Sequence, residues 1–443
     1  MPLYVVKRKS HFLIIFAEYN AKIVQRNGIN YLQRIINEQF LQNNINDKRL
    51  ICYLRVLNFV YMKKAQLLLT LFITLFAARA VADDALLSSP TKVEITAESS
   101  SAASAKIAQT GMETNSLNLE IGLSKLRLFG YGQMWFNYKN SAGETTNGAD
   151  VKRIILMADA QITKEISFFL MYDAVESELH EYYAQYTFKP WLQVRAGQFK
   201  QPFTLESLYS PTFMSTILYD PSVLYLAGIA TDPLMGNNVA RDTGVMLTGD
   251  FLKNSKGRYL FNYSLGVFNG PGMNQSENNS QKDVAGMLKY MPTQGLLLAG
   301  SFLVGTGNAQ SASPYGRVAE GENYSRHRWS AGLEVKSEPF YLRSEYIQGS
   351  DAGIQSRGGY VNFIYTPVEK FDLVLNWDYL NKNTALGKSE QGNFNCVTEQ
   401  NTYTVGAQYW IYKRCRFSAQ YVYTKPRVGN ICREFISQLQ LSF

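Results

Sequence analysis

The chain has 443 residues, of which 18% are charged, and it contains 29 Tyr, 25 Phe and 5 Trp but only 3 His. A charged fraction of about 25% is usual for a soluble protein, whereas the mean hydropathy of −0.18 is too polar for a helical membrane protein. These values exclude a disordered chain, a coiled coil and a polytopic helical transporter, and they favour a transmembrane β-barrel, in which half of the strand residues face water.

The net charge of +8 comes from the N-terminal part of the chain. Residues 1–82 contain 12 of the 44 Lys and Arg and 3 of the 36 Asp and Glu, which leaves 32 basic and 33 acidic residues in 83–443. The remainder is nearly neutral, so its charge gives no support for nucleic-acid binding.

A secretory signal peptide is predicted at 62–82. Met62, Lys63 and Lys64 open a basic region, 67–78 is mostly apolar, and 80–82 reads Ala-Val-Ala before two Asp. The apolar run is too short for a membrane helix, which needs about 20 residues. We expect translation to start at Met62 and 1–61 not to belong to the native protein, the alternative being an unusually long basic region. Residues 83–125, which include a Ser/Ala-rich stretch at 99–105, are predicted to be a flexible periplasmic segment, with a short helix or strand possible at Leu117–Ile121.

From residue 126 onward the chain repeats short alternating segments rich in Tyr, Phe, Val and Leu, separated by turn signals. Each segment is close to the 9–11 residues that a tilted membrane strand needs. We predict sixteen strands, at 127–138, 151–162, 165–173, 180–188, 192–200, 242–251, 258–268, 282–291, 295–304, 326–336, 339–347, 357–366, 371–381, 402–412, 415–424 and 432–443.

The connections between these strands alternate in length. Two- to four-residue turns such as 163–164, 189–191 and 337–338 alternate with mostly longer loops at 139–150, 201–241, 269–281, 305–325 and 382–401. Short periplasmic turns and long outer loops are typical of an outer-membrane barrel. A soluble β-sandwich is the alternative, but its turn lengths would not segregate in this way. The predicted fold is therefore all-β, a 16-stranded antiparallel transmembrane β-barrel that occupies 126–443.

The two faces of each strand can be assigned from the alternation. Phe435, Leu439, Leu441 and Phe443 share one face of the last strand, and we expect apolar faces to contact lipid because a charge at the bilayer midplane costs about 2–4 kcal/mol. A terminal Phe443 after such a strand is typical of proteins that the barrel-assembly machinery recognises. Aromatic residues near strand ends are expected at the membrane interfaces, namely Tyr138, Phe188, Phe251, Phe268 and Tyr412.

Three segments resemble the phosphate-selective porin O/P family. They are VRAGQFKQPFTLE at 194–206, ARDTGV at 240–245 and GVFNGPG at 266–272, and the likeness extends over about 127–443. The resemblance implies a 16-stranded outer-membrane porin of Gram-negative bacteria that is usually trimeric. It also implies a third loop, here 201–241, that folds inward and narrows the pore.

Porins select solutes with rings of charged side chains, since Arg and Lys favour anions and Asp and Glu favour cations. Strand parity predicts that the pore-lining bases are Arg153, Arg195, Arg241, Arg326, Arg328 and Arg343. The predicted pore-lining acids are Asp159, Glu181, Glu334, Glu345, Asp372 and Asp378. Each of these charges has the alternative of a solvated wall residue or one half of a cross-strand ion pair.

The predicted inward loop carries Glu206, Asp220 and Asp232, with Lys200 and Arg241 only at its ends. Phosphate-specific members of the family are expected to have a lysine-rich constriction, and the sequence shows none. The resemblance therefore supports a porin more strongly than it supports a preference for phosphate.

Signals for catalysis or cofactor binding are weak. His180 and His327 are the two histidines after the predicted signal peptide, and neither forms a recognisable hydrolase motif with the nearby Ser177, Glu178 or Ser325. The sequence contains no metal-binding or nucleotide-binding motif. We therefore expect no catalytic residues, no metal and no cofactor.

Three cysteines follow the predicted signal peptide: Cys396, Cys415 and Cys432. Strand parity places Cys396 and Cys432 at the same outer rim and Cys415 at a periplasmic turn. We predict a disulfide between Cys396 and Cys432, because exported compartments permit one, and two free thiols are the alternative.

The predicted function is passive diffusion of small polar or anionic solutes, with phosphate as one candidate, through a porin of the bacterial outer membrane. The expected partners are outer-membrane lipid, these solutes, the barrel-assembly machinery through Phe443, and two further copies of the chain in a homotrimer. Two alternatives remain: a barrel plugged by the 201–241 loop with a structural or adhesive role, and a barrel hydrolase that uses His180 or His327.

Overall fold

The computed structural model describes residues 117–121, 124–236, 238–392 and 398–443. Within them, no helix is long and apolar enough to cross a membrane. The helices are α4 (Leu205–Leu208), α5 (Pro221–Leu226) and α6 (Lys388–Gln391). The strands are β1 (Leu117–Ile121), β2 (Ser124–Ser141), β3 (Glu144–Gln161), β4 (Ile166–Asp173), β5 (Glu178–Lys189), β6 (Leu192–Lys200), β7 (Arg241–Lys253), β8 (Tyr259–Phe268), β9 (Asp283–Tyr290), β10 (Leu296–Asn308), β11 (Asn323–Ser337), β12 (Phe340–Asp351), β13 (Ile354–Val368), β14 (Phe371–Asn381), β15 (Glu399–Tyr412), β16 (Cys415–Pro426) and β17 (Cys432–Ser442).

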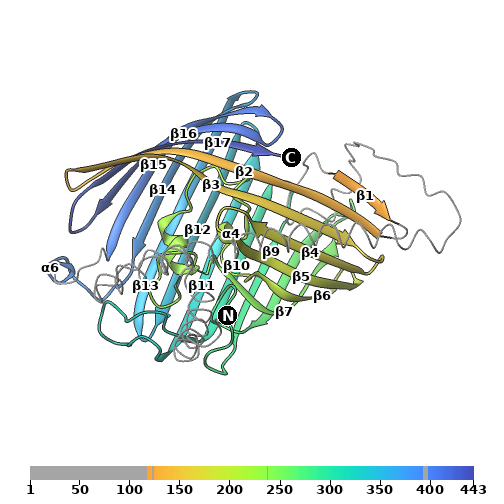
Figure 1. Cartoon of the computed structure of the whole chain (residues 1–443), viewed down its shortest axis with the longest axis horizontal. Helices are drawn as coiled ribbons and strands as arrows, with labels where there is room; N and C mark the ends of the chain where they lie inside the picture. Colours follow the sequence, from red (N-terminus) through yellow and green to blue (C-terminus); the bar gives the residue numbers. More distant parts are fainter. Residues whose placement is uncertain (1–116, 122–123, 237, 393–397) are drawn as a thin grey trace, which may run out of the picture. The chain divides into compact units, whose positions relative to one another are not determined.

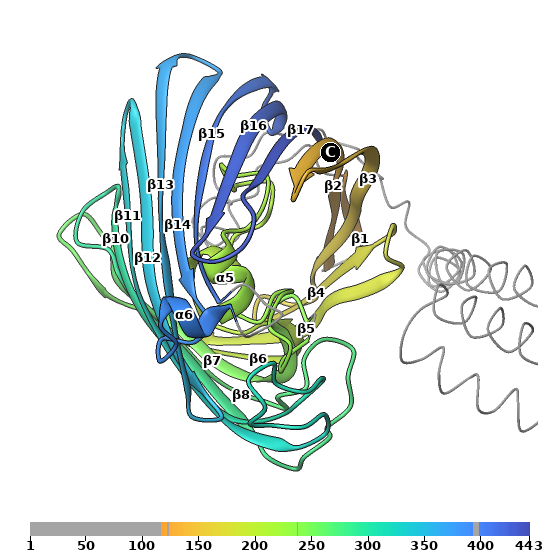
Figure 2. The same cartoon turned by 90° about the vertical axis from the view of Figure 1, so that its left-hand side faces the viewer.

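Strands β2 to β17 form a closed ring. Each pairs antiparallel with the next along the chain, and β17 pairs with β2 from Cys432↔Ser141 to Ser442↔Tyr131 (Figures 1 and 2). Closure leaves no open sheet edge at membrane depth, which satisfies the backbone hydrogen bonds without water. The predicted 16-stranded antiparallel barrel is confirmed.

The connections at the two ends of the barrel differ in length. At one end, called here the turn end, β3–β4, β5–β6, β11–β12 and β15–β16 are joined by two to four residues. The other end, the loop end, carries the longer connections 201–240, 269–282, 309–322 and 382–398. This asymmetry matches the sequence-based expectation of periplasmic turns and outer loops.

The prediction of a long loop at 139–150 is wrong, because most of these residues belong to two strands. Strands β2 and β3 continue to Ser141 and Glu144 and are joined by a turn of Ala142 and Gly143, both with positive φ. The region has few apolar residues, so it lacks the alternation on which the strand prediction depended. Strand β4 pairs with β3 only from Ile155 onward, so among the described residues 144–153 pair with β2 alone.

Strand β1 lies in the segment predicted to be flexible, at the position where a short strand or helix was considered. It pairs with the first residues of β2, from Leu117↔Leu128 to Ile121↔Ser124. Strand β17 covers the same side of β2 further along, and the backbones of Gly130 and Phe443 exchange two hydrogen bonds of 3.0 Å next to that pairing. Residues 1–116, which include the predicted signal peptide, lie outside the described residues.

The predicted faces of the strands agree with the burial of their side chains. Leu375, Trp377 and Phe435 are exposed on the outer face, whereas Asn376, Asp378 and Gln438 are buried on the inner face. One predicted interfacial aromatic residue is wrong: Phe268 is 0% exposed. It points inward because it packs against Phe199, with 5.5 Å between the ring centroids.

Candidate functional site

The connection between β6 and β7, residues 201–240, enters the barrel and is called here the inward loop. Figure 2 shows α5 inside the ring of strands. Helix α5 contacts β12, β13 and β14, and its Val223 and Leu226 are fully buried. The loop therefore packs against one side of the inner wall.

Helix α4 is attached to β11 and β12 by polar contacts. The backbone N–H of Leu205 donates to both carboxylate oxygens of Glu345, at 2.8 and 2.9 Å. Glu206 forms an ion pair with Arg343, with 3.3 Å between Oε1 and Nη2. The Tyr209 hydroxyl, one residue after α4, donates to Glu334.

The middle of the inward loop is held by β13 and β16. Arg416 Nη2 donates to the Met214 carbonyl at 2.6 Å, and Gln420 Nε2 donates to the Ser215 carbonyl at 2.7 Å. The Ser215 hydroxyl donates to Asn362 Oδ1 at 2.7 Å. Several of these bonds go to backbone carbonyls, so they fix the path of the loop and do not depend on the side chains it carries.

The last part of the loop is clamped by Arg328 on β11. Its guanidinium donates to the Leu226 carbonyl at 2.6 Å, and it forms ion pairs with Asp351 at 2.7 Å and with Asp232 of the loop. At the start of α5, the Ser222 N–H donates to Asp378 Oδ2 at 3.0 Å. Arg328 thus connects β11, β12 and two points of the inward loop.

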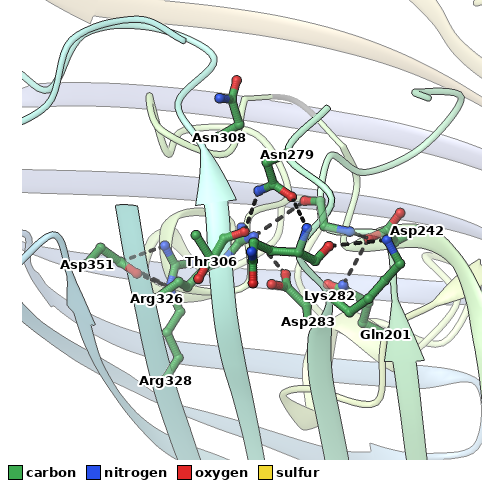
Figure 3. Close-up of polar contacts among 12 residues, drawn as sticks. Gln201, Asp242, Asn279, Lys282, Asp283, Thr306, Asn308, Arg326, Arg328 and Asp351 are labelled. Atoms are coloured by element: carbon green, nitrogen blue, oxygen red, sulfur yellow. Dashed lines mark hydrogen bonds and ion pairs between the residues drawn. The ribbon is translucent and has the colours of Figure 1, made fainter. Parts of the chain in front are cut away.

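A polar network continues along the loop end from β7 to β12 (Figure 3). Arg326 and Asp283 form an ion pair of 2.7 Å, and neither side chain is more than 1% exposed. Asp242 accepts from the Gly270 N–H at 2.5 Å and lies 3.5 Å from Gln201 Nε2 at the start of the loop.

The predicted basic residues face the interior in two different environments. Arg326, Arg328 and Arg343 are buried in ion pairs, and Arg241 is 5% exposed and pairs with Glu181 at 2.9 Å. Strand alternation alone does not identify these partners, because Asp351 lies on the neighbouring strand, Asp283 and Glu181 lie two strands away, and Asp232 and Glu206 lie on the loop. The other two, Arg153 and Arg195, remain partly exposed.

The predicted acidic residues are also engaged. Asp159 pairs with Arg127 at 3.0 Å, and Asp372 accepts from Gln408 and Trp410, both at 2.7 Å. The other predicted acids make the contacts described above, namely Glu181, Glu334, Glu345 and Asp378. Of these, Glu334 also pairs with the neighbouring Lys336. Within the described residues, no group of His, Cys, Asp and Glu could hold a metal ion.

A cluster of basic side chains lies between the wall and the inward loop. Arg153 of β3, Lys200 of β6 and Arg241 of β7 all act electrostatically on His180, and Glu181 is the carboxylate in this group. Lys200 Nζ donates to the Tyr209 carbonyl at 2.8 Å. The sequence showed Lys200 only as the residue before the loop, and it did not indicate that Lys200 lies within electrostatic range of Arg153.

Tyrosines of the wall and the loop complete this cluster. The Tyr131 hydroxyl interacts with Arg153 and with Ser210 of the loop. Burial raises the pKa of Tyr219, also in the loop, to about 12, while Arg153 and Arg241 act in the opposite direction. Basic residues on the wall therefore face hydroxyl groups on both sides of the narrowed interior.

An apolar patch lines the inner wall of β2, β3 and β4. It consists of buried side chains against which Phe213 of the inward loop packs, namely Phe129, Tyr131, Ile155, Met157, Phe169 and Met171. The alternation rule, which puts apolar residues toward lipid, does not anticipate it. Coverage by the loop explains why these strands are apolar on both faces.

The remaining candidates lie near the rim. His327 on β11 is exposed on the outer face, opposite Ser350 and Val304, whereas His180 is partly buried on β5. Cys415 and Cys432 form no disulfide with another described residue. Cys396 lies outside the described residues, so its disulfide with Cys432 stays a prediction.

Comparison with solved structures shows the fold. The barrel is similar to the anion-selective porin from Comamonas acidovorans, with 12% identity, a TM-score of 0.53 and coverage of 72% of this chain and 100% of that chain. It is also similar to Pseudomonas putida OprB, with 12% identity, a TM-score of 0.52 and coverage of 72% and 94%. OmpT of Vibrio cholerae has 10% identity, a TM-score of 0.52 and coverage of 73% and 100%.

Comparison of the sequence shows a family likeness over part of the chain. No curated protein sequence matches the chain significantly. Residues 129–299, which run from β2 to β10 and contain the inward loop, match the family described as phosphate-selective porin O and P. Over these residues the chain resembles the phosphate-selective porin O and P family, and it is a porin of the bacterial outer membrane.

Proposed function

We propose that the porin passes small polar and anionic solutes by passive diffusion and favours anions. The observation that carries this proposal is the cluster of Arg153, Lys200 and Arg241 at the inward loop, with Glu181 as its carboxylate. Because Glu181 is paired with Arg241, Arg153 leaves a positive excess where the pathway is narrowed, and such an excess attracts anions and repels cations.

The buried arginines do not contribute in the same way. Arg326, Arg328 and Arg343 are at most 1% exposed, and each is paired with a carboxylate. A paired, buried charge has little field left for a passing ion. The partly exposed Arg153 is therefore a residue whose charge a solute meets near the inward loop, and its substitution tests the proposal.

The experiment is single-channel recording of refolded protein in planar bilayers under a KCl gradient. Wild type should reverse at a potential that indicates preference for chloride, and Arg153→Glu should move this potential toward preference for potassium. Lys256→Glu, at an exposed turn, makes the same charge change outside the barrel and should leave the potential near the wild-type value. A wild-type preference for potassium would contradict the proposal.

Phosphate is proposed as one of the anions. Hydroxyl and cationic groups such as Tyr131, Ser210 and Arg153 are suitable donors for a tetrahedral oxyanion. If phosphate binds at this cluster, millimolar phosphate added to the KCl solutions should block the pathway and reduce chloride conductance. An unchanged conductance would leave a general anion porin.

We also propose that the porin assembles as a homotrimer and has no enzymatic activity. One similar structure is described as the trimer form of OmpT, with 12% identity and a TM-score of 0.50. Conductance that opens in steps of three would support the trimer. The family and the fold indicate a channel and not a hydrolase, and unchanged conductance in His180→Ala and His327→Ala variants would agree.

The plugged barrel remains the competing function. Its supporting observation is the burial of the inward loop, in which Phe203, Leu205 and Leu226 are at most 2% exposed. Well-folded protein that conducts no ions would favour it over the porin.

A further inference from the structure

The outer face of β13 to β16 contains an open apolar groove of about 590 Å³. It is lined by two cross-strand rows of outward side chains. The row nearer the loop end contains Val361, Trp377, Tyr403 and Tyr423, and the next row contains Phe363, Leu375, Val405 and Tyr421. Three of the four side chains in the first row are aromatic and bear a polar atom, whereas Tyr421 is the one such side chain in the second row.

The sequence of these two rows, from the loop end toward the turn end, corresponds to the headgroup region and the acyl chains of a membrane lipid. Aromatic residues with a polar atom favour the boundary between headgroups and hydrocarbon, and aliphatic residues favour the hydrocarbon. Trp377 donates its indole N–H to Asn401 at 3.1 Å, toward the loop end, which fits a position at that boundary. The groove therefore begins at headgroup depth and continues into the membrane.

Two cations lie at the headgroup end of the groove. Arg433 on β17 is the cross-strand neighbour of Tyr423, with its guanidinium 5.9 Å from the ring centroid. Lys425 on β16 is two residues beyond Tyr423, so it lies on the same outward face. Diagonal neighbours on paired strands are about 7–8 Å apart at the backbone, a spacing at which two long side chains can reach one phosphate.

The charge of these two residues is not balanced nearby. Neither forms an ion pair with any described residue in the structure, and the undescribed stretch 393–397 contains no acidic residue. The carboxylate of Glu399 is already held by Arg427 at 2.5 Å. An apolar groove with an uncompensated positive end is complementary to an amphiphile with an anionic head.

We propose that this groove binds a phosphorylated lipid with several acyl chains, of the kind found in the outer leaflet of the outer membrane. Its phosphate contacts Lys425 and Arg433, and one acyl chain lies along Trp377, Val405 and Tyr421. A contact of this kind is independent of the solute pathway, because all of these side chains point away from the barrel interior.

The test is native mass spectrometry of detergent-solubilised barrels loaded with purified lipid A, a bis-phosphorylated glycolipid with several acyl chains. Wild type should retain bound lipid A, and the double variant Lys425→Gln/Arg433→Gln should bind it at least tenfold more weakly. The matched control is Lys164→Gln/Lys256→Gln, which removes two exposed cations from the turn end and should bind as wild type does. Equal retention by the two double variants overturns the proposal.

A second measurement separates the headgroup from the chains. Val405→Trp fills the groove on the outward face and leaves both cations in place, so it should also weaken lipid A retention. Competition by phosphatidylcholine at equal concentration should fail, because it carries no net charge. If phosphatidylcholine displaces lipid A as well as lipid A displaces itself, or if Val405→Cys barrels cross-link to one another through this position, the groove is not a site for an anionic lipid.

Discussion

Arg343 on β12 and Glu206 in α4 form a buried ion pair, with 3.3 Å between their closest atoms and at most 1% of either side chain exposed. The two residues are 137 positions apart in the chain. Their contact joins the barrel wall to the inward loop. The wall arginine thus positions the element that narrows the pore.

Arg343→Met should release this part of the loop. Breaking a buried pair leaves one charge uncompensated and costs about 3–5 kcal/mol. We expect a lower midpoint of thermal unfolding and faster protease cleavage within 204–226. Arg127→Met, which breaks the partly exposed pair with Asp159, is the control and should cost about 1 kcal/mol or less. Equal effects of the two variants would contradict an anchoring role.

Loop anchoring should weaken as pH rises. Burial, together with the nearby Glu206 and Asp378, raises the pKa of Asp220 well above its usual value, while Arg343 partly opposes the shift. Because the folded Asp220 carboxyl holds its proton more tightly than the unfolded one, its contribution to stability is full below the unfolded pKa and is lost as pH rises toward the folded pKa. Hydrogen exchange of residues 204–222 should therefore be slower at pH 5 than at pH 9, after correction for intrinsic rates. Asp220→Asn should reduce this difference, and a larger difference in the variant would contradict the assignment.

Arg328→Lys should loosen the end of the inward loop although the charge is kept. Arg328 contacts Leu226 through Nη1, Asp232 through Nη2 and Asp351 through both Nε and Nη2, and one ammonium cannot reproduce this set of contacts. We expect a destabilisation of about 1–3 kcal/mol and larger fluctuations of the open-channel current. Lys388→Arg, on the exposed helix α6, should change neither quantity.

Gly197→Ala should prevent normal pairing of β5 and β6. Gly197 has a φ of +136°, and an added Cβ would lie 2.2 Å from the Tyr182 carbonyl oxygen. The clash is with backbone, so no side-chain movement relieves it. Gly148→Ala, where nothing lies within 4 Å of an added Cβ, should fold as wild type does. The measurement is the yield of heat-modifiable folded barrel on electrophoresis.

The proposed disulfide between Cys396 and Cys432 can be read directly from mature protein. Alkylation under native and reducing conditions, followed by mass spectrometry, should label Cys415 in both cases and Cys432 only after reduction. Labelling of all three thiols without reduction would show that the pair does not form.

The sequence predicted the barrel well because alternation is a local property. The strands at 192–200 and 371–381 were placed with the observed bounds, and burial alternates along the strands as the predicted faces require. The anchors of the inward loop could not be predicted in this way. Their partners come together only when the barrel closes, as Glu206 and Arg343 show, and the inward position of Phe268 likewise depends on its contact with Phe199.

The long β2–β3 hairpin, in which residues 144–153 of β3 pair on one side only, has a consequence for the crowded cell surface. An exposed strand edge is a template on which another chain can add a strand, and aggregation begins in this way. Here the edge runs through Glu144, Thr145, Thr146, Asn147 and Gly148. Hydrated and charged residues with a glycine make poor partners for a foreign strand, so the hairpin can project from the rim without causing neighbouring barrels to associate through their backbones.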